Sequence, residues 1–197
     1  MALLLGLLTG LALVAPVGPI SIALVGVGVT GGRRPAVRAA GGVALADAVM
    51  VTIAFALGSL ILTAPERVTD VVEVVLGVVL VAIALSMIGE ADRMVETAGR
   101  LRRPATALFT ATAANPLTLT VWVGVAAAAP YAGDSFSRSL FVGGLITASV
   151  VWHTFLALGA AAVGPKIRPS WLAWGSRIAG VLVLGIGVFT MAGPFRG

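Results

Sequence analysis

The sequence has no cysteine, a single histidine and few charged residues, which make up 11% of its 197 residues. Without cysteine the chain forms no disulfide and carries no thiol redox relay. The lone histidine has no second histidine or acidic side chain beside it at helical spacing, so we expect no metal site and no cofactor. Hydrophobic residues make up 59% of the chain, which leaves too few polar side chains to cover a water-soluble globule. This composition fits a protein whose solvent is a lipid bilayer.

The sequence also lacks the side-chain arrangements of an enzyme. It contains no nucleophile beside a base, no phosphate-binding loop and no paired carboxylates. Basic residues outnumber acidic ones by 13 to 8, but they occur in short clusters between long apolar runs. That pattern is typical of membrane orientation rather than of binding to nucleic acid. We therefore expect neither catalysis nor a nucleic-acid partner.

Six apolar runs are long enough to cross a membrane. A crossing needs about 20 apolar residues to span roughly 30 Å of hydrocarbon. A cleaved signal peptide has basic residues before its apolar run. This sequence has none before its first run, so we expect that run to be a retained helix. The predicted fold is an all-α membrane protein with one transmembrane domain over residues 1–197. Its six helices are predicted at about 3–29, 38–62, 71–89, 105–129, 139–163 and 177–194.

The basic residues are distributed unevenly among the connecting loops. Of the 13 lysines and arginines, 10 lie in the first, third and fifth loops, and the other three lie in the second loop, the fourth loop and the C-terminal tail. Basic loops stay on the cytoplasmic side of a membrane. The bias therefore predicts that the odd-numbered loops are cytoplasmic and that both termini lie outside.

A faint internal repeat divides the chain into halves at about 1–95 and 100–197. Because each half contains three helices, an odd number, the second half would enter the membrane from the opposite side, as in the inverted repeats of many transporters. The residue types that match are common in this chain, so chance can supply some of the matches. The matched segments are Pro16 with Pro116, Gly41-Gly42 with Gly143-Gly144, Ala56-Leu57-Gly58 with Ala157-Leu158-Gly159, and residues 77–80 with 180–183.

Proline motifs interrupt the first and fourth predicted helices at corresponding places. The first helix contains Pro16, Gly18 and Pro19, and the fourth contains Asn115 and Pro116. Proline has no N–H group, so carbonyls one turn earlier lose their usual donors. The carbonyls concerned belong to Ala12, Ala15 and Thr112.

The same motifs are typical of the start of a new half-helix. Gly18 or Asn115 would be the N-cap, with a proline at the first helical position. The free N–H groups and the positive dipole at such ends suit a carboxylate or another anionic group. The alternative is an ordinary proline kink whose freed backbone groups bond to neighbouring helices. The matched positions of the two breaks favour a binding site.

Two ionisable residues lie inside predicted helices. Asp47 is in the second helix, without another charged residue for several turns. An acidic residue at the centre of a membrane is costly, so it usually faces a cavity, pairs or carries protons. We expect Asp47 to bind substrate and protons in turn; the alternative is a static hydrogen bond to another helix. His153, in the fifth helix about one turn past the repeat equivalent of Asp47, is a weaker candidate for relaying protons; the favoured alternative is a simple hydrogen bond to another helix.

The remaining candidates are hydroxyls and small or aromatic residues. Threonines in the fourth helix can line a polar path or serve helix packing, and Thr118 is our candidate for substrate binding. Gly6 and Gly10 allow backbones to approach closely, which serves packing and permits a homodimer. The other threonines of that helix are Thr110, Thr112 and Thr120, and Ser21 follows the first break. Interface anchors or packing residues are expected at Trp122, Trp171 and Trp174.

Taken in order, the Gly18-Pro19 break, the intramembrane Asp47, the Asn115-Pro116 break and six helices in 197 residues resemble the lysine-exporter (LysE/RhtB) translocator family. The resemblance extends from Gly10 to Gly193. Two positions depart from it: the first break reads Pro-Val-Gly-Pro where many relatives have Ser/Thr-Pro-Gly-Pro, and Leu117 replaces a lysine that often follows Asn-Pro. The fourth helix also has no acidic residue after Asn-Pro, which weakens the case for a dibasic substrate.

The resemblance implies a secondary transporter in a prokaryotic plasma membrane. Such a protein would export amino acids or related small metabolites from the cytoplasm, in exchange for protons. The family's functional positions correspond to Gly18, Pro19, Asp47, Asn115 and Pro116. Two other functions remain open from the residues alone: a passive channel or facilitator, and a membrane scaffold that transports nothing. A metal-ion exporter is disfavoured by the scarcity of ligands.

Overall fold

The computed structural model describes residues 1–15, 18–62, 66–93, 97, 101–129, 134–166 and 168–193, with side chains throughout except at 57–62, 66–69, 72–73, 116, 127–128, 165 and 169. All regular elements within these residues are helical, which confirms the predicted all-α class. The helices are α1 (Ala2–Val14), α2 (Pro19–Gly31), α3 (Arg33–Leu62), α4 (Glu66–Gly89), α6 (Pro104–Ala113), α7 (Pro116–Ala128), α8 (Ser135–Val163), the short 3-10 helix η1 (Gly164–Lys166) and α9 (Pro169–Met191).

The first and fourth predicted helices are each divided at their proline motifs. The chain bends by 81° between α1 and α2, and by 60° between α6 and α7. Gly18 and Asn115 are the N-caps of α2 and α7, and Pro19 and Pro116 are the first residues of these helices. Proline costs no hydrogen bond there, because the first N–H groups of any helix lack an intrahelical acceptor. Pro16 lies outside the described residues.

Three helices are long and apolar enough to cross a membrane by themselves: α3, α8 and α9. If each bent pair forms one crossing, the described residues contain five. The remaining predicted crossing, at about 71–89, falls in α4, whose apolar stretch Val74–Gly89 is shorter than a full crossing. The chain is therefore a multi-pass membrane protein, and its sixth crossing stays a prediction.

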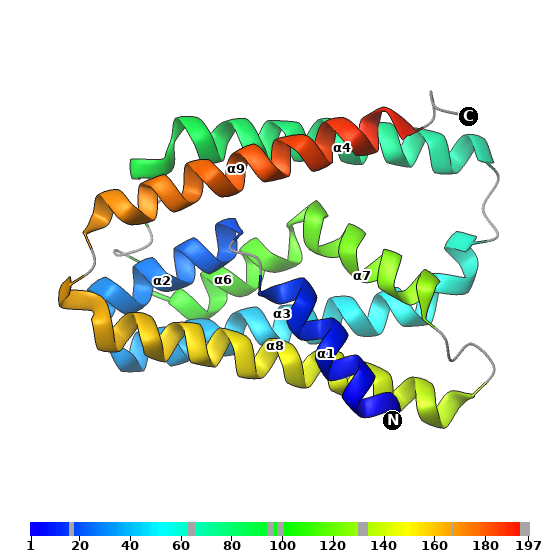
Figure 1. Cartoon of the computed structure of the whole chain (residues 1–197), viewed down its shortest axis with the longest axis horizontal. Helices are drawn as coiled ribbons and strands as arrows, with labels where there is room; N and C mark the ends of the chain where they lie inside the picture. The colour runs from blue at the N-terminus through cyan, green and yellow to red at the C-terminus, as the bar shows by residue number, and fades with distance from the viewer. Residues whose placement is uncertain are drawn as a thin grey trace.

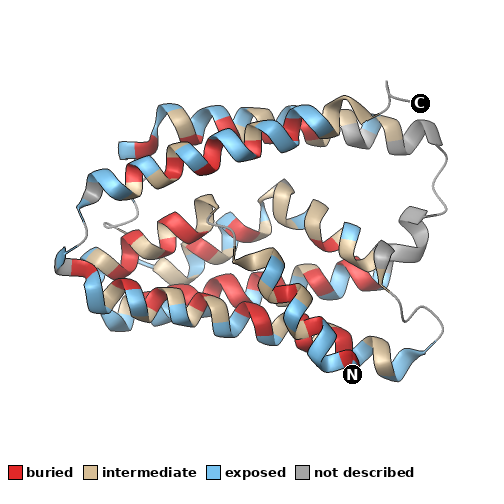
Figure 2. Ribbon diagram, viewed as in Figure 1, coloured by how far each residue is buried: buried red, intermediate tan, exposed pale blue. Residues whose placement is uncertain are grey.

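The helices are arranged in layers (Figure 1). An antiparallel pair, α4 and α9, lies on one side of the molecule, α1, α3 and α8 lie on the other, and α2, α6 and α7 lie between them. The α4–α9 pair contacts the central layer where α2 meets α9 and where α7 meets α4. Buried residues face the interior of these layers (Figure 2). Large apolar side chains such as Leu45, Phe155 and Phe189 point outward, where lipid would cover them.

Glycines allow several of these helices to pack with their backbones in contact. A Cβ atom at Gly42 of α3 would collide with the backbone of Ala105 in α6, and one at Gly144 of α8 would collide with the backbone of Leu3 in α1. Gly6 and Gly10 pack in the same way against α8, as the sequence predicted. Because this glycine face is buried within the chain, it is not available for the homodimer that it was expected to permit.

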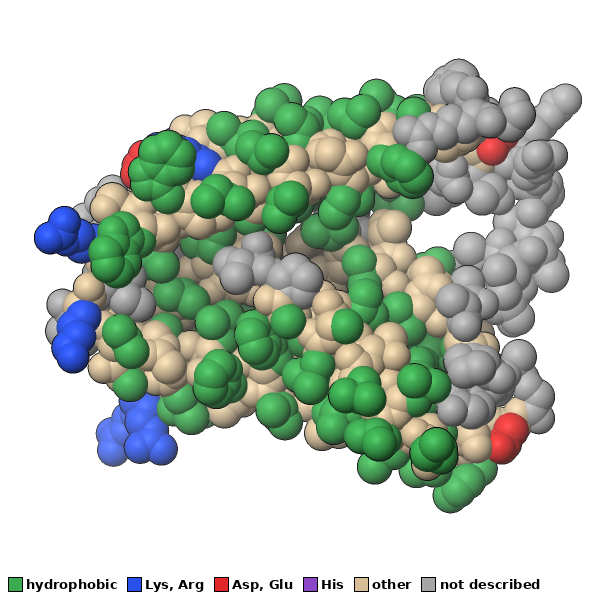
Figure 3. Space-filling model, in the orientation of Figure 1, with side chains coloured by type: hydrophobic (Ala, Val, Ile, Leu, Met, Phe, Trp, Pro, Cys, Tyr) green, Lys and Arg blue, Asp and Glu red, His purple; other side chains and the backbone are tan. Residues whose placement is uncertain are grey.

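The basic side chains on the face drawn in Figure 3 gather at one end of the molecule. This is the end where α2 leads into α3 and where α8 leads through η1 into α9. The start of α1 and the end of α9 lie at the opposite end (Figure 1). The orientation predicted from the loops would place this basic end in the cytoplasm.

Candidate functional site

Both helix breaks and the buried carboxylate of α3 line a single cavity. Its volume is about 490 Å³. Gly18 and Pro19 reach it from the start of α2, Asn115 from the start of α7, Asp47 from α3 and His153 from α8. These residues are far apart in sequence, and the fold brings them together around this cavity. Cavities of roughly 300–1,000 Å³ are typical of small-molecule sites, and this one suits a solute of amino-acid size.

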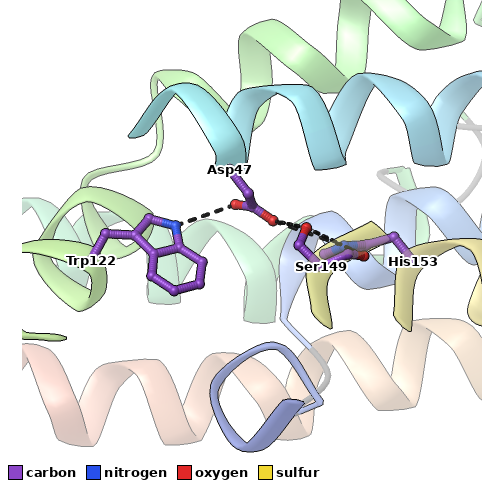
Figure 4. Close-up of polar contacts among 4 residues, drawn as sticks. All are labelled: Asp47, Trp122, Ser149 and His153. Atoms are coloured by element: carbon purple, nitrogen blue, oxygen red, sulfur yellow. Dashed lines mark hydrogen bonds and ion pairs between the residues drawn. The ribbon is translucent and has the colours of Figure 1, made fainter. Parts of the chain in front are cut away.

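Asp47 is buried and held by side chains from two other helices (Figure 4). Its side-chain carboxylate accepts a hydrogen bond from Ser149 Oγ of α8, with 2.6 Å between Oγ and Oδ2. Trp122 of α7 donates from Nε1 to Oδ1 over 3.4 Å. Only 4% of Asp47 is exposed, so these donors replace the water that a carboxylate would otherwise bind.

His153 extends this arrangement along α8. Its Nδ1 lies 2.9 Å from the carbonyl oxygen of Ser149, 3.1 Å from Ser149 Oγ and 3.8 Å from Asp47 Oδ2. Since a carbonyl oxygen can only accept, Nδ1 is the donor in the shortest of these contacts. Asp47, Ser149 and His153 therefore form one connected group of buried polar side chains.

The sequence did not single out Ser149 or Trp122 as site residues. Ser149 follows Asp47 by 102 residues, the spacing that pairs Gly42 with Gly144, so the repeat could have revealed it. Trp122 was expected as an interface anchor or a packing residue, but only 2% of it is exposed and it donates to Asp47. Nothing in the local sequence distinguishes it from Trp171 and Trp174, which are 62% and 61% exposed.

The two half-helix ends at the cavity differ in how their N–H groups are satisfied. Asn115 caps α7 with its own side chain, since Oδ1 accepts from Leu117 N over 3.1 Å. Gly18 has no side chain, and no side-chain cap closes the start of α2. The Thr112 carbonyl at the end of α6 was predicted to lack a donor. It accepts a hydrogen bond from Asn115 N over 3.2 Å, so it has a partner.

The threonines of the fourth predicted helix separate into two groups. Thr112 and Thr118 line the cavity, whereas Thr110 is exposed on the surface of α6. Thr112 is 2% exposed, and its hydroxyl has no hydrogen-bond partner among the residues that the structure describes. A buried hydroxyl without a partner is costly, so this oxygen needs a hydrogen-bond partner that the described residues do not supply.

Of the predicted site residues, the structure places six around the cavity. The side chain of Pro116 and all of Pro16 lie outside the described residues. Within the described part of the chain, no group of three or more histidine, cysteine or acidic residues could hold a metal ion. The six residues are Gly18, Pro19, Asp47, Asn115, Thr118 and His153.

A protein-family model described as LysE type translocator matches residues 11–193, which is nearly the whole chain. Neither a curated protein nor a solved structure matches the sequence. The match agrees with the resemblance seen in the proline breaks and Asp47, and it includes every residue that lines the cavity.

Proposed function

Because the chain belongs to the LysE type translocator family, whose members are membrane transporters of amino acids or similar solutes, we propose that it exports such solutes from the cytoplasm by proton antiport. The observation that carries this proposal is the single cavity shared by both helix breaks and the buried Asp47. The proposed location is a prokaryotic plasma membrane, with both termini outside.

A zwitterionic solute matches the chemistry of this cavity. Its carboxylate would lie at the half-helix ends that begin at Gly18 and Asn115, where N–H groups and the helix dipole favour negative charge. Its ammonium group would lie toward Asp47, the acidic side chain among the described lining residues. Thr118 lines the same space and offers a hydroxyl to the solute.

Competition at Asp47 supplies the coupling. A proton and the ammonium group of the solute would each neutralise the same carboxylate, so the binding of one releases the other. His153 Nδ1 lies 3.8 Å from Asp47 Oδ2, and because Nδ1 already holds a proton in its bond to the Ser149 carbonyl, a second proton would occupy Nε2. This competition is the minimum requirement for exchanging solute against protons.

Symmetry between the two halves supports alternating access. Gly42 contacts Ala105, and Leu3 contacts Gly144. Gly144 follows Gly42 by 102 residues and Ala105 follows Leu3 by 102 residues, so each contact is the repeat equivalent of the other. The Asp47–Ser149 bond joins two residues with the same separation, so an inverted repeat would place this bond on its two-fold axis. We propose that the two three-helix repeats rock about this region and expose the cavity to each side in turn.

The test uses proteoliposomes loaded with a mixture of amino acids. We expect wild-type protein to release some of them faster when a proton gradient is imposed, and a protonophore to abolish that acceleration. Asp47→Asn keeps the shape of the side chain and removes its exchangeable proton, so release should no longer depend on the gradient. If Asp47→Asn behaves as wild type, the coupling mechanism is wrong.

The two alternatives differ from an exporter in what they predict. A passive channel would release solute at a rate that no proton gradient changes. A scaffold would have a dry, packed interior with the breaks as simple kinks, whereas the breaks here face a cavity lined by Asp47 and Asn115. The cavity therefore favours transport over the scaffold, and the gradient experiment separates an exporter from a channel.

A further inference from the structure

The N-terminal end of α2, at the cavity, has no side-chain cap. Asn115 closes the start of α7 by accepting from Leu117 N, so that end already has an acceptor. At the start of α2 the N-cap is Gly18, and no side chain caps it. A Cβ atom at Gly18 would meet no atom within 4 Å, so the space beside this end is open. The N–H groups of the first turn of α2 are therefore available to an anionic group.

A second observation points to the same ligand. Thr112 in the last turn of α6 lines the cavity and is 2% exposed. Its hydroxyl has no partner among the described residues, although threonine hydroxyls elsewhere in the chain bond to a carbonyl one turn earlier, as Thr30 and Thr147 do. A hydroxyl that forgoes this bond can donate to a carboxylate.

The described lining residues offer no partner for a charge on the side chain of the solute. Asp47 is the acidic side chain among the described lining residues, and in the proposed function it already binds the α-ammonium group of the solute. The wall contributed by α9 is a stripe of apolar side chains with helical spacing: Ala179, Leu182, Val183 and Ile186. A second charge on the solute would lie against this wall without a partner, which is costly.

We infer that the substrate is a neutral α-amino acid with an aliphatic side chain, of the size of valine, leucine, isoleucine or methionine. Its carboxylate binds the free N–H groups of α2 and the hydroxyl of Thr112, and its side chain packs against the apolar stripe of α9. Thr112 becomes a substrate-binding residue in addition to those that the sequence predicted. This inference rests on the proposed function, because it names the solute of the same cavity.

The experiment is counterflow in proteoliposomes that contain unlabelled L-leucine inside and labelled L-leucine outside. We expect accumulation of label, and competition by valine, isoleucine and methionine but not by lysine, arginine or glutamate. Leucinamide, which keeps the side chain and lacks the carboxylate, should not compete.

Two substitutions test the carboxylate site. Thr112→Val keeps the shape and removes the hydroxyl, and Gly18→Asn gives α2 the cap that α7 has. Each should raise the KM for leucine about tenfold or more, with kcat changed less, because a hydrogen bond to a charged group is lost. Gly18→Ala adds a methyl group without an acceptor and should raise KM less than Gly18→Asn. Thr110→Val, at an exposed threonine of the same helix, is the control.

The outcomes separate this inference from the proposed function. If wild-type protein exchanges lysine or glutamate as well as leucine, the aliphatic class is wrong and the exporter remains. If leucine is exchanged but Thr112→Val and Gly18→Asn leave its KM unchanged, the carboxylate site is wrong. If no amino acid of any class is exchanged, both the inference and the proposed function are wrong. Thermal stability should be kept in Thr112→Val, because its hydroxyl bonds to no described protein group.

Discussion

Asp47 owes its position to contacts between helices rather than to its own helix. Its two oxygens are bonded by Ser149 from α8 and by Trp122 from α7, so three helices meet at one carboxylate. A buried carboxylate without such donors would be costly in a membrane interior. The same two donors hold the carboxylate in place at the wall of the cavity.

We expect Ser149→Ala to destabilise the protein. The change removes the donor at 2.6 Å from Asp47 and leaves a buried acceptor with one partner fewer, so the free energy of unfolding should fall by about 1–3 kcal/mol. Unfolding in detergent micelles, followed by tryptophan fluorescence, measures the change. Ser139→Ala is the matched control, because that exposed serine of α8 bonds only to the carbonyl of Ser135 in its own helix. Equal effects of the two substitutions would contradict this role.

At the scale of elements, the α4–α9 pair is distinct from the rest of the molecule. The two helices pack closely because glycines face one another: a Cβ atom at Gly77 would lie 2.6 Å from Met191 N and 2.7 Å from the Gly187 carbonyl. Gly180 approaches the backbone of Ala84 in the same interface. Since α9 also supplies the apolar wall of the cavity, the position of this pair sets the size of the cavity.

Gly77→Ala should therefore loosen this pair. The added methyl group cannot fit without moving α9, and overpacking of this kind costs about 1–3 kcal/mol. Gly185→Ala is the control, because Gly185 lies in α9 and a Cβ atom there would meet no atom within 4 Å. This change should leave stability unchanged or raise it slightly. Thermal unfolding of both variants in detergent compares them. A stable Gly77→Ala variant would mean that α4 and α9 are free to separate.

At the scale of the whole molecule, the basic side chains are distributed unevenly between the two ends. The basic side chains lie at one end, and α1 begins and α9 ends at the other (Figures 1 and 3). Inside a membrane this asymmetry decides which end stays in the cytoplasm. The helix breaks lie between the two ends, so the cavity would be near the middle of the bilayer, where inverted-repeat transporters bind their solutes.

The absence of cysteine allows a direct test of this orientation. Ser135→Cys lies at the start of α8, at the end opposite to the basic cluster, and Lys166→Cys lies in η1 at the basic end. In intact cells a membrane-impermeant maleimide should label Ser135→Cys, and it should label Lys166→Cys only after the membrane is opened. Wild-type protein gives the background, since it has no thiol. The reverse labelling pattern would place the basic end outside.

The sequence alone determined the class of the fold, the two breaks and six of the residues around the cavity. Apolar runs require helices because backbone groups in lipid must bond within their own segment. Proline at 19 and 116 predicts helix starts because it lacks an N–H group and fits the first helical position. Asp47 stood out because a lone acidic residue in an apolar helix is costly unless it has a use.

Only the tertiary structure decided which side chains complete the site. Ser149 and Trp122 are ordinary residues in their own helices, and their role depends on α7 and α8 packing beside α3. The difference between the open end of α2 and the capped end of α7, and the unpartnered hydroxyl of Thr112, likewise depend on what each group meets across the cavity. Local sequence determines which groups need partners, whereas packing between distant segments determines which of them find one.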